Sequence, residues 1–262
     1  MFDKIKALNT VKRDGSKLAF ISPELQNDKD VVLAAVGNDV FALMFASPEL
    51  KNDKDVVLKA ISHDGTALRF ASPEMRNDKD VVLKAVSQNE DALKYASPEL
   101  KNDRDVVLKA VESDGYALWY AGPEMQNDKD VVLKAVENYG NALLDASNEL
   151  RNDKDVVLAA VSENGYALQY ASPDMRNDKD VVLKAVSLYG DALKFASPEL
   201  QNDKDVVLEA VGHSCYHSCY AWYYISPELK KDKGVIAAAN GLCEDDIGDD
   251  DIGDDDPGDI GD

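Results

Sequence analysis

Pairs of aspartates are the most frequent arrangement of reactive side chains in this sequence. One residue separates the two members, as in Asp28 and Asp30 or Asp103 and Asp105. Carboxylates at this spacing can bind metal ions or serve in acid–base catalysis. A catalytic centre, however, is one asymmetric arrangement, whereas this pair recurs eight times at the start of a predicted helix. An aspartate there caps the free backbone N–H groups of the helix. We therefore interpret the pairs as helix caps and expect no catalytic residue.

A second arrangement, His213, Cys215, His217 and Cys219, contains residue types that bind zinc. It arises from a duplicated His-Ser-Cys-Tyr segment. On a helix the two histidines would share one face, and the cysteines would lie about 200° around the axis. One ion could contact all four side chains only if the segment formed a loop. Lengthening of a loop explains the duplication without a metal, so these residues are weak metal candidates and we predict no cofactor.

Acidic residues dominate the charge of the chain. The net charge is −21, and residues 244–262 contribute ten Asp and one Glu with no basic residue. These carboxylates could bind calcium weakly, but the ordered Asp-x-Asp-x-Asp-Gly loop of a tight site is absent. Nucleic-acid binding needs a cationic surface, and none is visible. We expect a disordered, solvated tail and no nucleic-acid ligand, and the charge favours a basic protein as partner.

A strict repeat positions these residues along the chain. The phrase Asn-Asp-x-Asp-Val-Val-Leu recurs every 25 residues, starting at Asn27, Asn52, Asn77, Asn102, Asn127, Asn152, Asn177 and Asn202. Such a period indicates an array in which each unit packs only on its neighbours. We assign residues 1–26 to a degenerate N-terminal capping repeat and 27–211 to the tandem repeats. Residues 212–240 form an irregular C-terminal repeat with a four-residue insertion, and 241–262 form the acidic tail.

The first half of a repeat predicts a helix of about ten residues. In residues 77–100, either Asn77 or Asp78 is the N-cap. The apolar face that follows consists of Val81, Val82, Ala85 and Val86. The helix then breaks, often at a glycine such as Gly65 or Gly115, which suits a left-handed helix end.

The second half of a repeat predicts a shorter helix and one further turn. The buried stripe of the shorter helix consists of Ala92, Leu93, Tyr95 and Ala96. Ser97 and Pro98 then begin the further turn, as N-cap and first helical position. The first, degenerate repeat matches the same apolar positions with Leu8, Val11, Leu18 and Phe20, and it should have a more polar outer face.

These patterns predict an all-α fold, an α-solenoid of 25-residue helix–helix repeats. The competing interpretation makes Val-Val-Leu a strand, as in a leucine-rich β/α solenoid, because adjacent valines favour strands. The leucine-rich signature is absent, however, and the Val-Val-Leu-x-Ala-Val spacing suits a helix better. Neither helix would be stable alone at this length, so stability must come from stacking.

Aromatic residues at loop and surface positions are the candidates for partner binding. Trp119, Tyr116, Tyr139, Tyr166 and Tyr189 stand where other repeats have polar residues. Exposed aromatics along one edge of a solenoid can anchor a protein or peptide. Alternatively, the rings cover neighbouring repeats.

One repeat departs from the pattern in its second half. Asp145 occupies the position at which other repeats place an aromatic ring, and Asn148 replaces the usual proline. A buried, unpaired carboxylate is costly. The sequence therefore predicts a local weak point at residues 141–148.

The repeat also resembles a known family. The rhythm Asp-x-Asp-Val-Val-Leu-x-Ala-Val, then Gly-x-Ala-Leu-x-Tyr-Ala-Ser-Pro-Glu-Leu, resembles the short helical repeat catalogued as domain of unknown function four-one-one-six. The resemblance extends from about Leu8 to Ala239. That family has no established activity, so the resemblance implies no functional residue. A short helical variant of the leucine-rich repeat is a weaker match.

Taken together, these features favour a non-enzymatic helical-repeat scaffold that mediates protein–protein interaction. The alternative is a metal-binding or metal-responsive protein that uses the His/Cys segment or the acidic tail. Three cysteines are too few for a disulfide framework, and the N-terminal residues lack the apolar core of a signal peptide. The longest apolar runs are far shorter than a membrane span. We expect a cytoplasmic protein that does not associate with membranes, with secretion by a route independent of a signal peptide left open.

Overall fold

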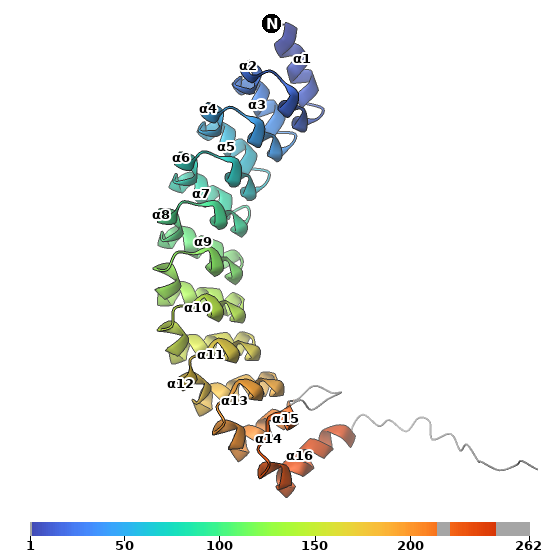
Figure 1. Ribbon diagram of the computed structural model, residues 1–262, viewed down its shortest axis with the longest axis vertical. Coiled ribbons are helices and arrows are strands. Elements are labelled where there is room, and N and C mark those ends of the chain that lie inside the picture. The colour runs from blue at the N-terminus through green and yellow to red at the C-terminus, as the bar shows by residue number, and fades with distance from the viewer. Residues whose placement is uncertain (1, 214–220, 245–262) are drawn as a thin grey trace, which may run out of the picture.

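The protein forms a curved stack of helical layers, one layer for each repeat (Figure 1). The computed structural model describes residues 2–213 and 221–244; Met1 and residues 214–220 and 245–262 lie outside the description. Within the described ranges every regular element is a helix or helical turn. The prediction of an all-α solenoid built from 25-residue units is therefore confirmed.

The first element of each repeat is its longest helix. These helices are α1 (Phe2–Val11), α3 (Lys29–Val36), α5 (Lys54–Ile61), α7 (Lys79–Val86), α9 (Arg104–Ser113), α10 (Lys129–Asn138), α11 (Lys154–Glu163), α13 (Lys179–Leu188), α14 (Lys204–Gly212) and α16 (Lys233–Glu244). Asp78, not Asn77, caps α7, because its carboxylate accepts a hydrogen bond from the Val81 N–H at 3.1 Å. Behind this cap, Val82 and Ala85 are completely buried, which confirms the predicted apolar face.

The second element of a repeat is a 3-10 helix, which winds more tightly than an α-helix. These are η1 (Gly15–Phe20), η2 (Val40–Phe45), η3 (Gly65–Phe70), η4 (Glu90–Tyr95), η5 (Gly115–Tyr120), η7 (Gly140–Asp145), η9 (Gly165–Tyr170) and η10 (Gly190–Phe195), and a short helix α15 (Ala221–Tyr224) takes this place in the last repeat. In η4 the Asn89 side chain caps the N-terminus by accepting a hydrogen bond from the Asp91 N–H at 2.9 Å. Ala92 and Leu93 point into the core.

A short helical turn completes each repeat and links it to the one before. The turns are α2 (Pro23–Gln26), α4 (Pro48–Lys51), α6 (Pro73–Arg76), α8 (Pro98–Lys101), η6 (Met125–Asn127), η8 (Leu150–Asn152), α12 (Pro173–Arg176), η11 (Leu200–Asn202) and η12 (Leu229–Lys231). Ser97 caps α8 as predicted, accepting a hydrogen bond from the Leu100 N–H at 3.2 Å. The Ser97 hydroxyl also donates to the Asn77 side chain of the preceding repeat, and its N–H donates to the Arg76 carbonyl. Asn77 is thus a contact between repeats rather than a cap.

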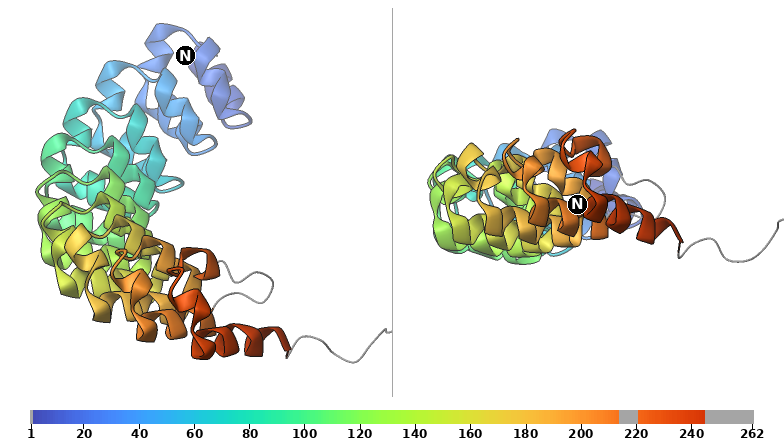
Figure 2. Two further views of the ribbon diagram at one scale, coloured as in Figure 1. Left: turned by 60° about the horizontal axis from the view of Figure 1, so that its bottom comes forward. Right: turned by 90° about the horizontal axis from the view of Figure 1, so that it is seen from below.

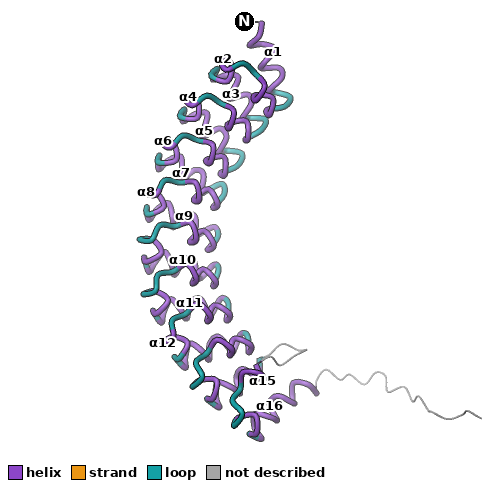
Figure 3. The backbone as a smooth tube through the Cα atoms, viewed as in Figure 1, coloured by secondary structure: helices purple, strands orange, loops and turns teal. Residues whose placement is uncertain are grey.

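The layers stack into an arc with two distinct edges. The short turns α2, α4, α6 and α8 follow the convex edge, and the loops that join each long helix to its 3-10 helix follow the concave edge (Figure 3). Both ends of the arc curve toward the same side in a second orientation (Figure 2). Long helices contact long helices and 3-10 helices contact 3-10 helices in successive repeats, so the array has two parallel rows with the core between them.

A ladder of ion pairs runs along the starts of the long helices. The Lys79 ammonium lies 2.8 Å from the Asp103 carboxylate and 2.7 Å from that of Asp105, both in the next repeat. The same two-pronged contact is made by Lys4, Lys29, Lys54, Arg104, Lys129, Lys154 and Lys179. The aspartate pairs are therefore helix caps, as predicted, and they also connect each repeat to the one before.

The glycines at the helix break serve a different purpose from the one predicted. A left-handed helix end requires a positive φ, and none of these glycines has one. A Cβ atom on Gly115 would instead lie 2.1 Å from the Ala135 carbonyl oxygen of the next repeat, and one on Gly65 would lie as close to Ala85. The prediction of a left-handed end was wrong: glycine is required here because adjacent layers approach closely.

The last described helix reaches further than the sequence suggested. α16 continues through Glu244, so the predicted start of the tail at residue 241 falls inside this helix. The rest of the acidic tail, from residue 245, lies outside the described residues. Nowhere in the described part of the chain is a helix both long and apolar enough to cross a bilayer.

The double role of the cap aspartates leads to a testable prediction. Burial alone would raise the pKa of the Asp103 carboxyl, but the Lys79 ammonium and the Val106 and Asp105 N–H groups together lower it below its ordinary value. Asp103→Ala removes both the cap and the ion pair and should reduce the free energy of unfolding by about 1 kcal/mol or more. Asp103→Asn keeps a good cap and should cost less. Thermal or urea unfolding at pH 7 measures both, and equal losses would contradict the double role.

Candidate functional site

A hollow in the row of 3-10 helices gathers most of the aromatic candidates. Its volume is about 220 Å³, and its lining residues come from η5, from η7 and the loop before it, and from η9. We call it the aromatic hollow; it is lined by Tyr116, Trp119, Tyr139, Asn141, Leu144, Asp145 and Tyr170. Because the hollow spans three successive repeats, no single repeat contains it.

Tyr139 reaches this hollow because it replaces a helix cap. The 3-10 helices in most repeats begin with a capping Asp or Asn, whereas Tyr139 begins η7 and makes no side-chain cap. The Gly140 N–H donates instead to the Glu163 carboxylate of the next repeat at 2.5 Å. Tyr189 likewise begins η10 without capping it. At both places an aromatic ring stands where a cap would stabilise the helix by about 1 kcal/mol.

The rings of the hollow contact one another and still face solvent. The Tyr116 ring centroid lies 5.9 Å from that of Tyr120 and 6.4 Å from that of Tyr139, both edge to face. Trp119 nevertheless remains 56% exposed and Tyr116 remains 43% exposed. The two interpretations drawn from the sequence thus hold together: the rings cover neighbouring repeats and also present a surface.

The remaining two aromatic candidates form a separate pair. Tyr166 and Tyr189 stack at 5.0 Å with 30° between their planes, and Tyr166 also meets Phe195 edge to face at 6.4 Å. None of these three rings lines the aromatic hollow. The structure therefore divides the five predicted residues into two groups along the array.

Asp145 is the residue of the hollow that sequence analysis treated as a defect. Its side chain is half-buried among the rings, and this burial raises the pKa of its carboxyl to about 6. Within the described residues it makes no ion pair, and no cation lines the hollow. The carboxylate therefore stands in an aromatic environment without the counter-ion that would stabilise its charge.

The metal candidates are only partly described. His213 ends α14, where its Nδ1 lies 3.1 Å from the Glu209 carbonyl oxygen and 3.6 Å from the Glu209 carboxylate. Cys215, His217 and Cys219 lie outside the described residues. Among the described residues, no three His, Cys, Asp or Glu side chains are grouped as metal ligands. The zinc hypothesis stays an untested prediction.

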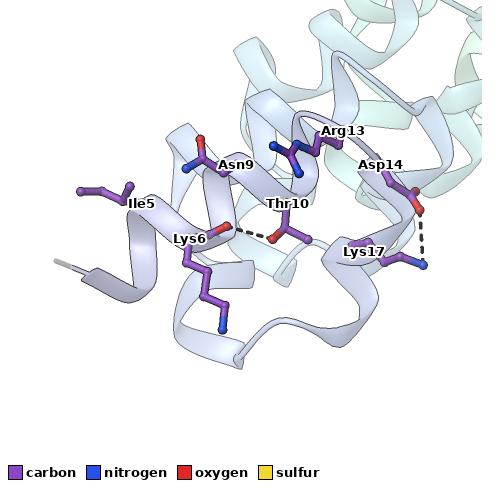
Figure 4. Close-up of a pocket in the computed structure, with 7 residues that line it drawn as sticks. All are labelled: Ile5, Lys6, Asn9, Thr10, Arg13, Asp14 and Lys17. Atoms are coloured by element: carbon purple, nitrogen blue, oxygen red, sulfur yellow. Dashed lines mark hydrogen bonds and ion pairs between the residues drawn. The ribbon is translucent and has the colours of Figure 1, made fainter.

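A larger and more open hollow lies at the N-terminal end of the stack. It has a volume of about 770 Å³, and Figure 4 shows its lining side chains along α1 and the start of η1. They are Ile5, Lys6, Asn9, Thr10, Arg13, Asp14 and Lys17. An ion pair between Lys17 and Asp14, at 3.3 Å, crosses one side of it.

This end differs from the polar cap that the sequence predicts. Phe20 is 83% exposed, although its equivalents in later repeats are half-buried. The reason is that a ring at this position packs on the preceding repeat, as Phe70 does on Phe41 at 6.0 Å, and no described repeat precedes Phe20. Lys6 and Thr10 are polar as expected, but the end is not wholly so. We interpret this hollow as the open end of the stack.

Comparison with known proteins identifies the repeat. The model of a domain of unknown function (DUF4116) matches residues 3–51, 31–76, 53–101, 78–126, 128–176 and 178–230. These segments cover most of the chain in phase with the structural layers, which confirms the resemblance inferred from the repeat motif. No curated protein and no solved structure matches the chain.

The raised pKa of Asp145 predicts a pH-dependent stability. A carboxyl titrates near pH 3.9 in an unfolded chain and, for Asp145, at about 6 in the folded one. The folded state therefore binds the extra proton between these values, so stability should fall as pH rises from about 4 to 6 and level off above. Asp145→Asn lacks this titration. It should exceed the parent by about 1 kcal/mol at pH 7, allowing for solvent screening, and by much less at pH 4. Urea unfolding of both proteins at the two pH values measures this, and a pH-independent difference would contradict the assignment.

Restoring the usual ring should strengthen the predicted weak point. Asp145→Tyr removes a half-buried charge and adds ring contacts, so we expect the melting temperature to rise by roughly 2–4 °C. The reciprocal change, Tyr170→Asp in the next repeat, places a carboxylate at the equivalent position and should lower it. Scanning calorimetry at pH 7 tests both, and no rise for Asp145→Tyr would refute the weak point.

Proposed function

This chain belongs to the DUF4116 repeat family, and we propose that it is a non-enzymatic scaffold that binds a basic protein along its row of 3-10 helices. We further propose that it acts in the cytoplasm. The array supplies a rigid surface that extends over many repeats, and the most frequent reactive groups, the aspartate pairs, are occupied in capping helices and joining layers.

Exposed aromatic and aliphatic side chains in the middle of the array carry this proposal. Trp119, Tyr116 and Leu144 leave 56%, 43% and 47% of their surfaces in contact with solvent, and all three line the aromatic hollow. Large rings in such positions gain free energy when a partner covers them, and tryptophan and tyrosine are enriched among the residues that dominate binding. These residues lie several repeats from either end of the array, so an open end of the stack does not explain their exposure.

Charge favours a basic partner. The chain has 50 acidic and 29 basic residues. The lysines that begin the long helices are already paired with aspartates, which leaves the surface mostly acidic. An acidic surface attracts a basic protein over distances of about 10 Å at moderate salt, and the attraction weakens as ionic strength rises.

Affinity capture with matched variants tests the proposal. The immobilised full chain and a chain ending at Gly241 are exposed to lysate of the native host at low and moderate salt. We expect a basic protein to be retained by both chains, less so at moderate salt. Trp119→Ala should lose it, whereas Met44→Ala, at the same position of an early repeat and 45% exposed, should keep it.

Three results would change the interpretation. A partner that is lost with the tail would make the acidic segment the binding element and the array a spacer. A partner that survives Trp119→Ala would place recognition elsewhere on the array. Retention of nothing by either chain would contradict the scaffold proposal, and calorimetric titration with zinc and calcium would then test the metal-binding alternative.

A further inference from the structure

The row of 3-10 helices contains its own cation-binding positions. The residue before the last one of each 3-10 helix, here called the cation position, is Met44, Arg69, Lys94, Trp119, Leu144, Gln169 or Lys194 in successive repeats. Wherever it is basic, its charged group lies over aromatic rings. Cations within about 6 Å of a ring centroid are attracted by the negative face of the ring.

Two repeats show the geometry for lysine. The Lys94 ammonium lies 5.9 Å from the ring centroids of Tyr95 in its own repeat and Tyr120 in the next. The Lys194 ammonium lies 4.6 Å from Phe195 in its own repeat and 5.4 Å from Tyr166 in the repeat before. A cation at this position can therefore meet three acceptors: the next residue, a ring 26 residues later and a ring 28 residues earlier.

Arg69 occupies the same position in its own repeat. Its guanidinium lies 4.3 Å from the Phe70 ring and 5.3 Å from the Phe41 ring of the preceding repeat. The spacing is therefore a property of the stack, and it recurs with different side chains because every layer is built alike.

Around Leu144 all three acceptors are present and the cation is missing. Tyr116 stands 28 residues earlier, Tyr170 stands 26 residues later, and the next residue is Asp145. These three side chains line the aromatic hollow together with Leu144 itself. Two rings and a carboxylate thus surround a place that repeats with Lys94 or Lys194 fill with their own ammonium group.

We propose that the aromatic hollow holds the side-chain ammonium of a lysine from the protein partner, with Tyr116 and Tyr170 against its chain and head and the Asp145 carboxylate as its counter-ion. The proposal rests on the proposed function, because the lysine belongs to the scaffold's partner. It identifies which surface residues make the contact and which residue of the partner enters.

Size and ring type favour lysine. The hollow of about 220 Å³ equals the volume of roughly seven water molecules in the liquid, enough for a butylammonium chain of five heavy atoms. Both internal cations that lie over tyrosine rings are lysines, whereas Arg69 lies between phenylalanines. The half-buried Asp145 carboxylate, which has no counter-ion of its own, would gain one on binding.

Binding of a single lysine can be measured directly on the full chain. The probe is the peptide acetyl-Gly-Gly-Lys-Gly-Gly-amide, and the matched control contains norleucine, which keeps the aliphatic chain but lacks the charge. The readout is the indole N–H signal of Trp119 in NMR spectra, assigned with Trp222→Phe. We expect a dissociation constant of roughly 1 mM for the lysine peptide and at least about tenfold weaker binding for norleucine.

Two variants locate the site. Leu144→Lys should place an internal ammonium in the hollow, as Lys94 and Lys194 do in theirs, and abolish peptide binding while keeping or raising the melting temperature. Met44→Lys makes the same change in an early repeat and should leave binding intact. Asp145→Asn should weaken binding about fivefold or more without unfolding the protein, and it decides the matter if Leu144→Lys fails to fold.

Specific results would overturn the cage. They are equal binding of the lysine and norleucine peptides, unchanged binding to Leu144→Lys or Asp145→Asn, or no shift of Trp119 at about 10 mM lysine peptide. Failure of this inference is distinguishable from failure of the proposed function. A captured partner that is lost with Trp119→Ala but kept by Leu144→Lys would leave the scaffold standing without the lysine. Peptide binding without any captured partner would do the reverse.

Discussion

One carboxylate at the start of each long helix holds the array together in two directions. Asp103 accepts hydrogen bonds from the Asp105 and Val106 N–H groups at 3.1 and 3.2 Å, which begins its own helix. The same side chain lies 2.8 Å from the Lys79 ammonium of the preceding repeat. Helices of eight to ten residues are barely stable alone. Because cap and ion pair share one atom group, forming the helix and stacking it on its neighbour are coupled. The row of 3-10 helices takes its register from that stack.

Much of a single layer could be predicted from the sequence, because local patterns report contacts over a few residues. The apolar face of α7, its aspartate cap and the serine cap of α8 all follow from such patterns. Contacts between layers do not, since they join residues 20 or 24 apart, as in Ser97 with Asn77 and Lys79 with Asp103. Gly115 illustrates the limit: its local position suggests a left-handed end, whereas its actual constraint is a carbonyl in the next layer.

The candidate site was visible in parts. Sequence reasoning selected Tyr116, Trp119 and Tyr139 because rings replace polar residues there, and the structure places all three around one hollow. It read Asp145 as a flaw, since a carboxylate at an aromatic position looks unfavourable in isolation. Only the stacked geometry shows that Asp145 faces rings from the repeats on both sides. Comparing the positions of Lys94 and Lys194 with that of Leu144 was the available signal, but it has meaning only once the spacing across layers is known.

The constancy of the spacing across layers has an evolutionary consequence. Every contact that joins two layers links residues at fixed offsets, so inserting or deleting a whole unit anywhere in the middle preserves each rung of the ladder. The surface is different, because the aromatic hollow draws residues from three consecutive units. Unequal recombination between near-identical repeats would therefore leave the fold intact while bringing new triplets of units together. Such a gene could sample binding pockets by changing its copy number, without a single point mutation in the core.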